Sequence, residues 1–414
     1  MRKKNDHDHG SRGRSNGIAA ALALAVTASL GALCAPAAWA DSAPSKAPVP
    51  SLSDILSSAG ITATGYVDAT FSAFGYSDPP AGITAPKDYN SFMFQQAGLT
   101  LAYQPAAGFG ALVDAVVTPY SSVYVDNYAP DTHYYFSSGM APGTPNVELF
   151  QGYAQYATGA WTVIAGKFST LAGAEVYAPN GDTNVTRSIL FSEEPLTHTG
   201  VRATYAVNSK LSLILGVNNG WISSGDETST GPEKTLEAGL SLTANKMWSW
   251  ALTNYYGRDT LAWGPAGLRG DVEFLDTVLT YNATSALTLI GSLDYGNVGN
   301  TPATPSASWW GVAGYVNYAL NGQWRVSLRG EYFDDQDGYL TGAYTYLTGT
   351  SATPSAGIAT AAQKLAEGTL TFGYDPFKDF ELRFEGRYDA PQSVDGVSRF
   401  PDATQGWVEA LFHF

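Results

Sequence analysis

The sequence predicts an all-β fold: a transmembrane antiparallel up-and-down β-barrel of about 16 strands, with short periplasmic turns and long extracellular loops. Apolar and polar residues alternate with a period of two through many segments, which is typical of strands with one apolar face. The connections alternate between short and long. Only 14% of the residues are charged, whereas a soluble domain averages about 25%. Because lipid offers no hydrogen-bond partner, such a sheet must close on itself.

The first segment, residues 1–40, is interpreted as a signal peptide. A basic start precedes a long uncharged apolar run that closes on the small-x-small site at residues 38–40. A retained membrane anchor is one alternative, but no positive flank follows the run. Lipidation of Cys34 is another, although Leu33 before it is not small. Export is therefore predicted, and the remaining chain has no cysteine.

Residues 41–60 are predicted to form a Pro-rich linker with a short helix that stops at Gly60. The barrel is expected to occupy residues 61–414. The whole chain has a net charge of −15, and the signal peptide holds five basic and two acidic residues, so its removal leaves −18. Nucleic acid is excluded as a partner by this charge.

Sixteen segments carry the strand pattern, taken in chain order. Turn-sized connections such as "QPAAG", "NK" and "NGQ" separate some neighbours, whereas long polar connections at 119–146, 169–197, 222–234 and 335–363 separate others. Many segments reach the length of about 9–11 residues that crosses a bilayer at a tilt. The predicted strands lie near 61–75, 91–104, 109–118, 147–158, 161–168, 198–206, 211–221, 235–244, 247–257, 271–283, 287–296, 308–320, 324–334, 364–374, 380–388 and 404–414.

Aromatic residues recur on one register close to the strand ends, where amphipathic rings would meet lipid headgroups. The final strand, "QGWVEALFHF", alternates in the same way and ends on Phe412 and Phe414. Both rings are predicted to face lipid and to act as the assembly signal of the barrel. The other aromatics on the outward register are Tyr103, Tyr156, Tyr205, Trp248, Tyr281, Tyr295, Tyr318, Tyr332, Tyr374 and Tyr388.

Three motifs carry a resemblance to a known family. They are "GKF-x-T-x-x-G-x-E" at residues 166–175, "TRS-x-L-F" at 186–191 and "THTGVR" at 197–202. Together they resemble the type 2 β-barrel porin family, OmpL-like, of Gram-negative outer membranes, and the resemblance spans most of the mature chain. The resemblance implies a porin-like channel in the bacterial outer membrane and no particular solute.

The connection 169–197, the third long one in chain order after 76–90 and 119–146, is predicted to fold inward and to narrow the pore, because charged residues gather in it and at its two ends. Opposed charges in a narrow waist orient water and screen solutes. The alternative for the loop is a set of salt bridges that only anchors it. For the alternating Arg and Glu residues of the strands near 324–334 and 380–388, the equally open alternative is that they neutralise one another's charge across strands. The predicted constriction and lumen residues are Lys167, Glu175, Asp182, Arg187, Glu193, Glu194, Arg202, Arg325, Arg329, Glu331, Arg383, Glu385 and Arg387. Further inward positions are Asp68, Asp114, Glu237, Asp276, Asp294, Glu381 and Asp389.

No catalytic, cofactor-binding or metal-binding set is predicted. An outer-membrane lipase needs a Ser and a His paired on the lipid-facing wall, but His198 shares the inward register of Arg202. The acids at 334–337 are interpreted as solvated loop charge rather than cation ligands.

The predicted function is an outer-membrane porin with a water-filled, cation-preferring channel for passive diffusion of small hydrophilic solutes and ions. Two alternatives are a structural or adhesive barrel whose loops bind a surface partner, and a soluble exported all-β domain. The expected partners are outer-membrane lipid and lipopolysaccharide, the barrel-assembly machinery and the small solutes, and a homotrimer is left open.

Overall fold

The computed structural model of the chain describes most of the predicted barrel. The predicted signal peptide and residues 41–55 of the linker lie outside the described residues. The structure describes residues 56–76, 89–118, 122–124, 133–135, 146–221, 234–260, 269–299, 306–337, 362–392 and 402–414.

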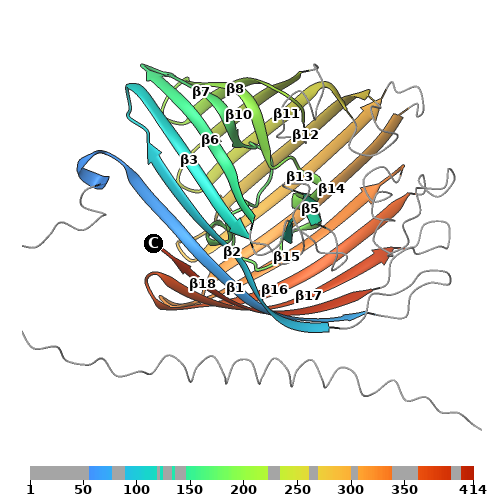
Figure 1. Cartoon of the computed structure of the whole chain (residues 1–414). Helices are drawn as coiled ribbons and strands as arrows, with labels where there is room; N and C mark the ends of the chain where they lie inside the picture. The colour runs from blue at the N-terminus through green and yellow to red at the C-terminus, as the bar shows by residue number, and fades with distance from the viewer. Residues whose placement is uncertain are drawn as a thin grey trace, which may run out of the picture.

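Sixteen antiparallel strands form one closed barrel in which each strand pairs with its neighbours along the chain (Figure 1). β4 (Ser122–Tyr124) and β5 (His133–Tyr135) form a separate two-stranded sheet. The barrel strands are β1 (Thr62–Tyr76), β2 (Tyr89–Tyr103), β3 (Gly108–Thr118), β6 (Asn146–Thr158), β7 (Trp161–Ser169), β8 (Thr197–Ala206), β9 (Leu211–Asn218), β10 (Thr235–Thr243), β11 (Trp248–Thr260), β12 (Arg269–Asn282), β13 (Leu287–Gly299), β14 (Ser306–Ala319), β15 (Trp324–Asp335), β16 (Gln363–Phe377), β17 (Phe380–Gln392) and β18 (Ala403–His413).

The predicted fold class is confirmed, and each predicted strand overlaps one strand of the barrel. One interpretation at a strand end was wrong. β15 runs to Asp335, so Asp334 and Asp335 are buried strand residues and not solvated loop acids. The Asp334 carboxylate lies 3.4 Å from the Lys364 ammonium on β16, which supplies the counter-charge.

The barrel closes between β1 and β18, where Val67 pairs with Phe412 in an antiparallel register. Beyond the end of β18, the Phe414 N–H donates to the Gly65 carbonyl at 3.0 Å, and the Gly65 N–H donates to the Phe414 carbonyl at 3.1 Å. The Phe412 and Phe414 rings remain exposed on the outside, in keeping with the lipid-facing register predicted for them.

The short turns at one end of the barrel share a hydrogen-bonding device. Asn208, Asn245 and Asn321 each accept backbone N–H bonds through Oδ1 from the residues two and three positions later, and Thr284 does the same through Oγ1. Such side chains stabilise a tight turn because their oxygens accept hydrogen bonds from backbone N–H groups that have no backbone acceptor within the turn. These four turns join β8–β9, β10–β11, β14–β15 and β12–β13.

A helical turn at residues 56–58 precedes β1. It ends in a Schellman motif, because the Ile61 N–H donates to the Leu56 carbonyl and the Gly60 N–H donates to the Ser57 carbonyl. Gly60 has φ +72°, a conformation that favours glycine. Within the described ranges, no helix is long and apolar enough to cross a membrane.

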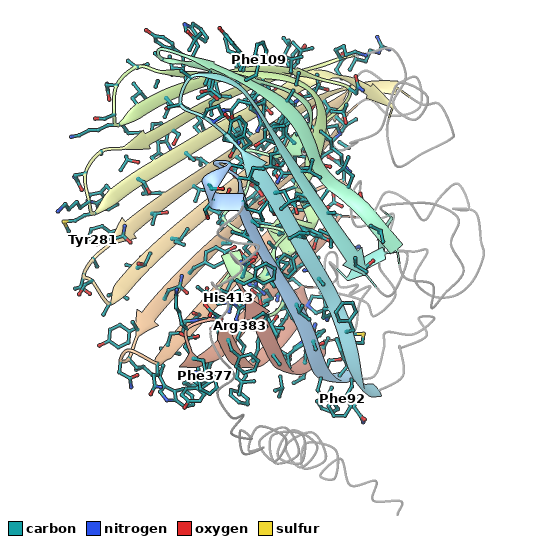
Figure 2. The ribbon with its side chains drawn as sticks, turned by 60° about the vertical axis from the view of Figure 1, so that its left-hand side comes forward. Phe92, Phe109, Tyr281, Phe377, Arg383 and His413 are labelled. Atoms are coloured by element: carbon teal, nitrogen blue, oxygen red, sulfur yellow. The ribbon has the colours of Figure 1, made fainter. Side chains whose placement is uncertain are left out.

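The outer surface of the barrel carries large apolar side chains. Phe109 is 77% exposed and Phe92 is 73% exposed, and Figure 2 shows both rings at the periphery of the molecule with Phe377 and Tyr281. In water such a surface would drive association, whereas in a bilayer it meets acyl chains. Among the predicted outward aromatics the exposed ones are Tyr103, Tyr156, Tyr205, Trp248, Tyr295, Tyr318 and Tyr388.

Candidate functional site

The connection between β7 and β8, residues 169–197, lies inside the barrel, and we call it the lumen loop. It contains a short 3₁₀ helix, η1 (Pro179–Gly181), and the one-and-a-half-turn helix α3 (Ile189–Glu193). Its polar groups reach strands on the far side of the barrel: the Thr183 hydroxyl donates to Asn317 on β14, and the Asn184 amide donates to Thr371 on β16. The loop therefore crosses the lumen.

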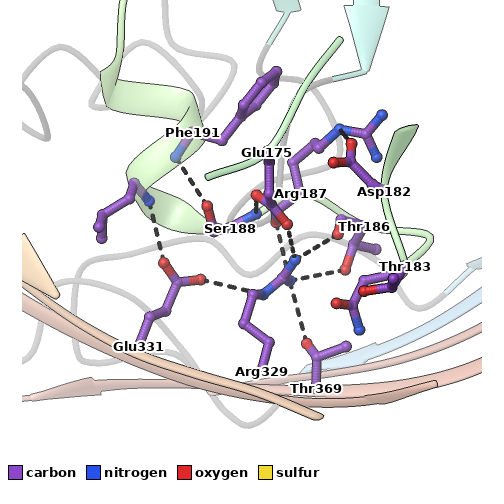
Figure 3. A network of polar contacts seen from close by, with 12 residues as sticks. Glu175, Asp182, Thr183, Thr186, Arg187, Ser188, Phe191, Arg329, Glu331 and Thr369 are labelled. Atoms are coloured by element: carbon purple, nitrogen blue, oxygen red, sulfur yellow. Dashed lines mark hydrogen bonds and ion pairs between the residues drawn. The ribbon is translucent and has the colours of Figure 1, made fainter. Parts of the chain in front are cut away.

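Arg329 on β15 is the centre of the contacts between the lumen loop and the wall (Figure 3). Its guanidinium forms ion pairs with Glu367 of β16 at 2.7 Å and with Glu175 of the loop at 2.8 Å. It also donates to the backbone carbonyls of Thr186 and Arg187. The Arg329 side chain is 0% exposed, so these partners must satisfy its charge without water.

Wall carboxylates bind the backbone N–H groups of the loop. Glu331 on β15 accepts from Ile189 at 2.7 Å and from Leu190 at 3.1 Å, which are the first two residues of α3. Glu385 on β17 accepts from Val185 at 2.6 Å and from Thr186 at 2.9 Å. These donors have no partner within a helix or strand, so the carboxylates replace the water that would otherwise solvate them.

Three further wall arginines bind loop carbonyls from the same side of the barrel. Arg325 donates to the Thr183 carbonyl at 2.6 Å, Arg383 to that of Pro179 at 3.0 Å, and Arg387 to that of Arg187 at 2.6 Å. Each is also ion-paired on the wall. We call Arg325, Arg329, Arg383 and Arg387, with their carboxylate partners Glu175, Glu367, Glu381, Asp389 and Glu409, the arginine network.

A second ion pair shapes the loop itself. The Arg187 guanidinium lies 2.9 Å from the Asp182 carboxylate and also donates to the Val176 and Tyr177 carbonyls. Burial raises the pKa of Asp182 to about 7, although the Arg187 charge acts in the opposite direction. The Tyr177 ring stacks on Phe150 of β6 with ring centroids 4.2 Å apart, which connects the loop to the opposite wall.

The other predicted site residues lie apart from the arginine network. Lys167 forms an ion pair with Glu148 at 3.1 Å, and both side chains keep 18% of their surface exposed. Arg202 forms a bidentate pair with Glu237 at 2.6 and 2.7 Å. Glu193 is buried in α3. The last of the predicted site residues, Glu194, follows α3 and lies next to the carboxylates of Asp276 on β12 and Asp294 on β13.

Apolar side chains also fill part of the interior, which sequence analysis did not predict. Phe274, Trp309 and Phe333 are 0% exposed and belong to one cluster with Ile189 and Leu190 of α3. The inward charges were expected to line a hydrated pore, but at the level of the lumen loop the structure buries them in a packed interior. Polar inward residues remain half-exposed on the wall of β2, β3 and β6, namely Thr100, Asp114, Gln151 and Tyr153.

A closed sixteen-stranded antiparallel barrel with an apolar outer surface and a loop folded into its lumen defines an outer-membrane porin. The family that the sequence matches agrees with this class of protein. The sequence matches the family described as "Putative beta-barrel porin-2, OmpL-like" over residues 60–414, and the chain belongs to that family. It is therefore a channel protein of the bacterial outer membrane, and the predicted resemblance is confirmed.

Solved structures with the same architecture have very different sequences. The outer membrane channel DcaP of Acinetobacter baumannii is 14% identical with a TM-score of 0.57, covering 86% of this chain and 97% of that chain. An anion-selective porin from Comamonas acidovorans is 12% identical (TM-score 0.55, 86% and 99% covered). OmpT of Vibrio cholerae, in a trimer form, is 11% identical (TM-score 0.53, 86% and 100% covered). No curated protein sequence matches this chain.

Proposed function

We propose that the channel lets small hydrophilic solutes and ions diffuse passively and that it prefers cations. The observation that carries the preference is an imbalance among the charges that face the lumen. The described inward-facing arginines are all ion-paired with carboxylates. In contrast, Asp114 is hydrogen-bonded only by the neutral groups of Thr100 and Gln151, so its charge is not neutralised by a cation.

The proposed route runs along the wall of β2, β3 and β6, beside the lumen loop. Four polar inward residues of this wall are half-exposed, namely Thr100, Asp114, Gln151 and Tyr153, whereas those of β15 and β17 facing the arginine network are buried. The lumen loop then acts as the constriction, and the arginine network is the support that holds it. Asp114 lies on the route, where an uncompensated carboxylate concentrates cations and repels anions.

The test is single-channel recording in planar lipid bilayers with a salt gradient across the membrane. Wild-type protein is expected to give a reversal potential of cation sign, because the lumen field is negative. D114N should move that potential toward zero, since it removes the uncompensated charge without changing the side-chain volume. D379N is the matched control, because Asp379 is an exposed residue of a short turn. A reversal potential of anion sign for the wild type would reject the cation preference.

A second candidate function is a structural or adhesive barrel whose loops bind a surface partner. The buried side chains of the arginine network favour it, because they occupy part of the lumen that a channel would need open. Absence of any conductance in the same recordings, from protein that is folded by gel mobility, would support this role over diffusion.

We also propose that the chain is not an enzyme and that it assembles as a homotrimer in contact with lipopolysaccharide after insertion by the barrel-assembly machinery. The His198 ring is fully buried, and its Nδ1 lies 3.1 Å from the Gly220 carbonyl, which leaves it remote from any lipid-facing substrate. The trimer form of OmpT supports the oligomeric state. Chemical cross-linking in mild detergent would distinguish a trimer from a monomer.

A further inference from the structure

Three carboxylates meet where the lumen loop leaves the lumen. Asp276 on β12 and Asp294 on β13 are direct cross-strand partners, and Glu194 at the end of α3 approaches them from the loop. One oxygen from each of the three lies within 4.8 Å of the others. Exposure is 0% for Asp276 and 2% for both Asp294 and Glu194. We call these residues the carboxylate cluster.

The carboxylate cluster has no compensating cation among the described residues. Neither Glu194, Asp276 nor Asp294 takes part in any ion pair of the described chain. Asp276 accepts one bond through Oδ1, from the Gly173 N–H at 2.7 Å. Its Oδ2 and both carboxylate oxygens of Asp294 are buried and accept no hydrogen bond from any donor of the described chain.

Such an arrangement is costly if all three groups are ionised. Like charges directly opposite each other on paired strands destabilise a sheet, and an unpaired buried charge costs several kcal/mol. The cluster must therefore hold either a shared proton or a bound cation.

The geometry favours a cation over an accidental contact. Asp294 points two unpartnered oxygens into the same buried space as Glu194, so the acceptors outnumber the donors there. Two oxygens bound to one Ca²⁺ at about 2.4 Å can lie up to about 4.8 Å apart, which matches the spacing of the cluster. Three carboxylate oxygens, completed by water, form the hard-ligand set that Ca²⁺ selects over softer metals.

The backbone leaves room for this arrangement at Gly173. Its φ is +93°, and a Cβ there would lie 1.9 Å from the Glu194 Oε2 atom, so any larger residue would displace the carboxylate. Gly311 lies opposite Asp294 on β14 and likewise adds no side chain. The small residues on both sides let Glu194 reach the wall.

We propose that Glu194, Asp276 and Asp294 bind one divalent cation of the calcium class, which fastens the exit of the lumen loop to β12 and β13. The cation would supply the positive charge that the arginine network supplies along the middle of the loop, at residues 179–187. The proposal concerns loop attachment and is independent of the ion selectivity of the channel.

The test uses the full-length barrel, folded in detergent, stripped with a chelator and then titrated with CaCl₂ by isothermal titration calorimetry. Wild-type protein is expected to show one site that D294N lacks or binds at least tenfold more weakly. CaCl₂ should also raise the temperature at which the unheated gel mobility is lost in the wild type and leave D294N unchanged. D379N, which alters an exposed carboxylate, should retain both responses.

Two results would overturn the proposal. If wild-type and D294N proteins bind CaCl₂ equally, the observed sites are surface carboxylates. If the wild type binds none, the cluster holds a proton, and its gel transition will depend on pH but not on CaCl₂. If D294N fails to fold, D276N tests the same site. The number of Ca²⁺ ions bound per wild-type chain, one or none, then decides between a bound cation and a shared proton.

Discussion

The middle of the lumen loop and its exit solve the same electrostatic problem in opposite ways. Near Glu175 and Thr186 the wall presents arginines, and each buried carboxylate there has a cation or a backbone N–H as its partner. Near Glu194 the wall presents Asp276 and Asp294, and the described chain supplies no cation. Burial is nearly complete in both regions. The difference shows that buried carboxylates do not by themselves indicate a salt bridge, because the described chain supplies the counter-charge in the middle of the loop and supplies none at its exit.

The largest expected effect comes from removing the central cation of the arginine network. R329M leaves Glu175 buried without its cation and leaves Glu367 with only the more distant Arg387 guanidinium at 3.8 Å, and breaking a buried pair in this way costs about 3–5 kcal/mol. We expect a much lower guanidinium midpoint for unfolding, measured by Trp fluorescence in detergent. R258M on the exposed face of β11 should change stability by less than about 0.5 kcal/mol. Equal midpoints for the two variants would show that the arginine network does not contribute to the stability of the barrel.

Removing a charged group from the carboxylate cluster should not lower the free energy of unfolding, in contrast to R329M. In the presence of a chelator, D294N removes one of two like charges on paired strands, so the free energy of unfolding should stay constant or rise by up to about 1 kcal/mol. The same denaturant titration measures it, with D379N as the reference. A loss of stability as large as that of R329M would mean that Asp294 already has a compensating partner, and the contrast between the middle of the loop and its exit would disappear.

The smallest expected effect is a pH dependence from within the loop. The folded protein holds the Asp182 proton more tightly than the unfolded chain does, because the pKa rises from 3.8 to about 7. The stability from this group is therefore fully present below about pH 3.8 and is lost as pH rises through about 7. The unfolding midpoint should fall as pH rises from about 3.8 to about 7, and D182N should reduce this slope. An unchanged slope in D182N would assign the dependence to other groups.

Much of the fold could be predicted from the sequence because strand period and turn length are local properties. Alternation along β1 or β17 identifies the two faces of each strand, and the Asn-containing turns set the short connections. Inward folding of the lumen loop could also be predicted from its charges and position. The pairing of Arg329 with Glu175 could not, because it joins residues far apart in sequence through the path of the loop.

Two features of the interior could not be predicted from the sequence for a different reason. Around Trp309 both faces of β14 are apolar, so alternation could not show which side chains enter the lumen. The bulge that separates Asp114 from Ala115 in the pairing of β3 with β6 shifts the register next to Phe150. The carboxylate cluster was within reach of sequence reasoning, since extending the β12–β13 hairpin outward from its short turn places Asp276 opposite Asp294.

The seam between β1 and β18 has a kinetic consequence. Tyr66 pairs with His413, so one edge of β1 has no partner until nearly all of the intervening chain has been synthesised and positioned. Unpaired strand edges are templates for association with other chains, and contacts between residues so distant in sequence form slowly. Closure of this seam is thus expected to come late in barrel formation, and the chain before closure is the species most prone to aggregate.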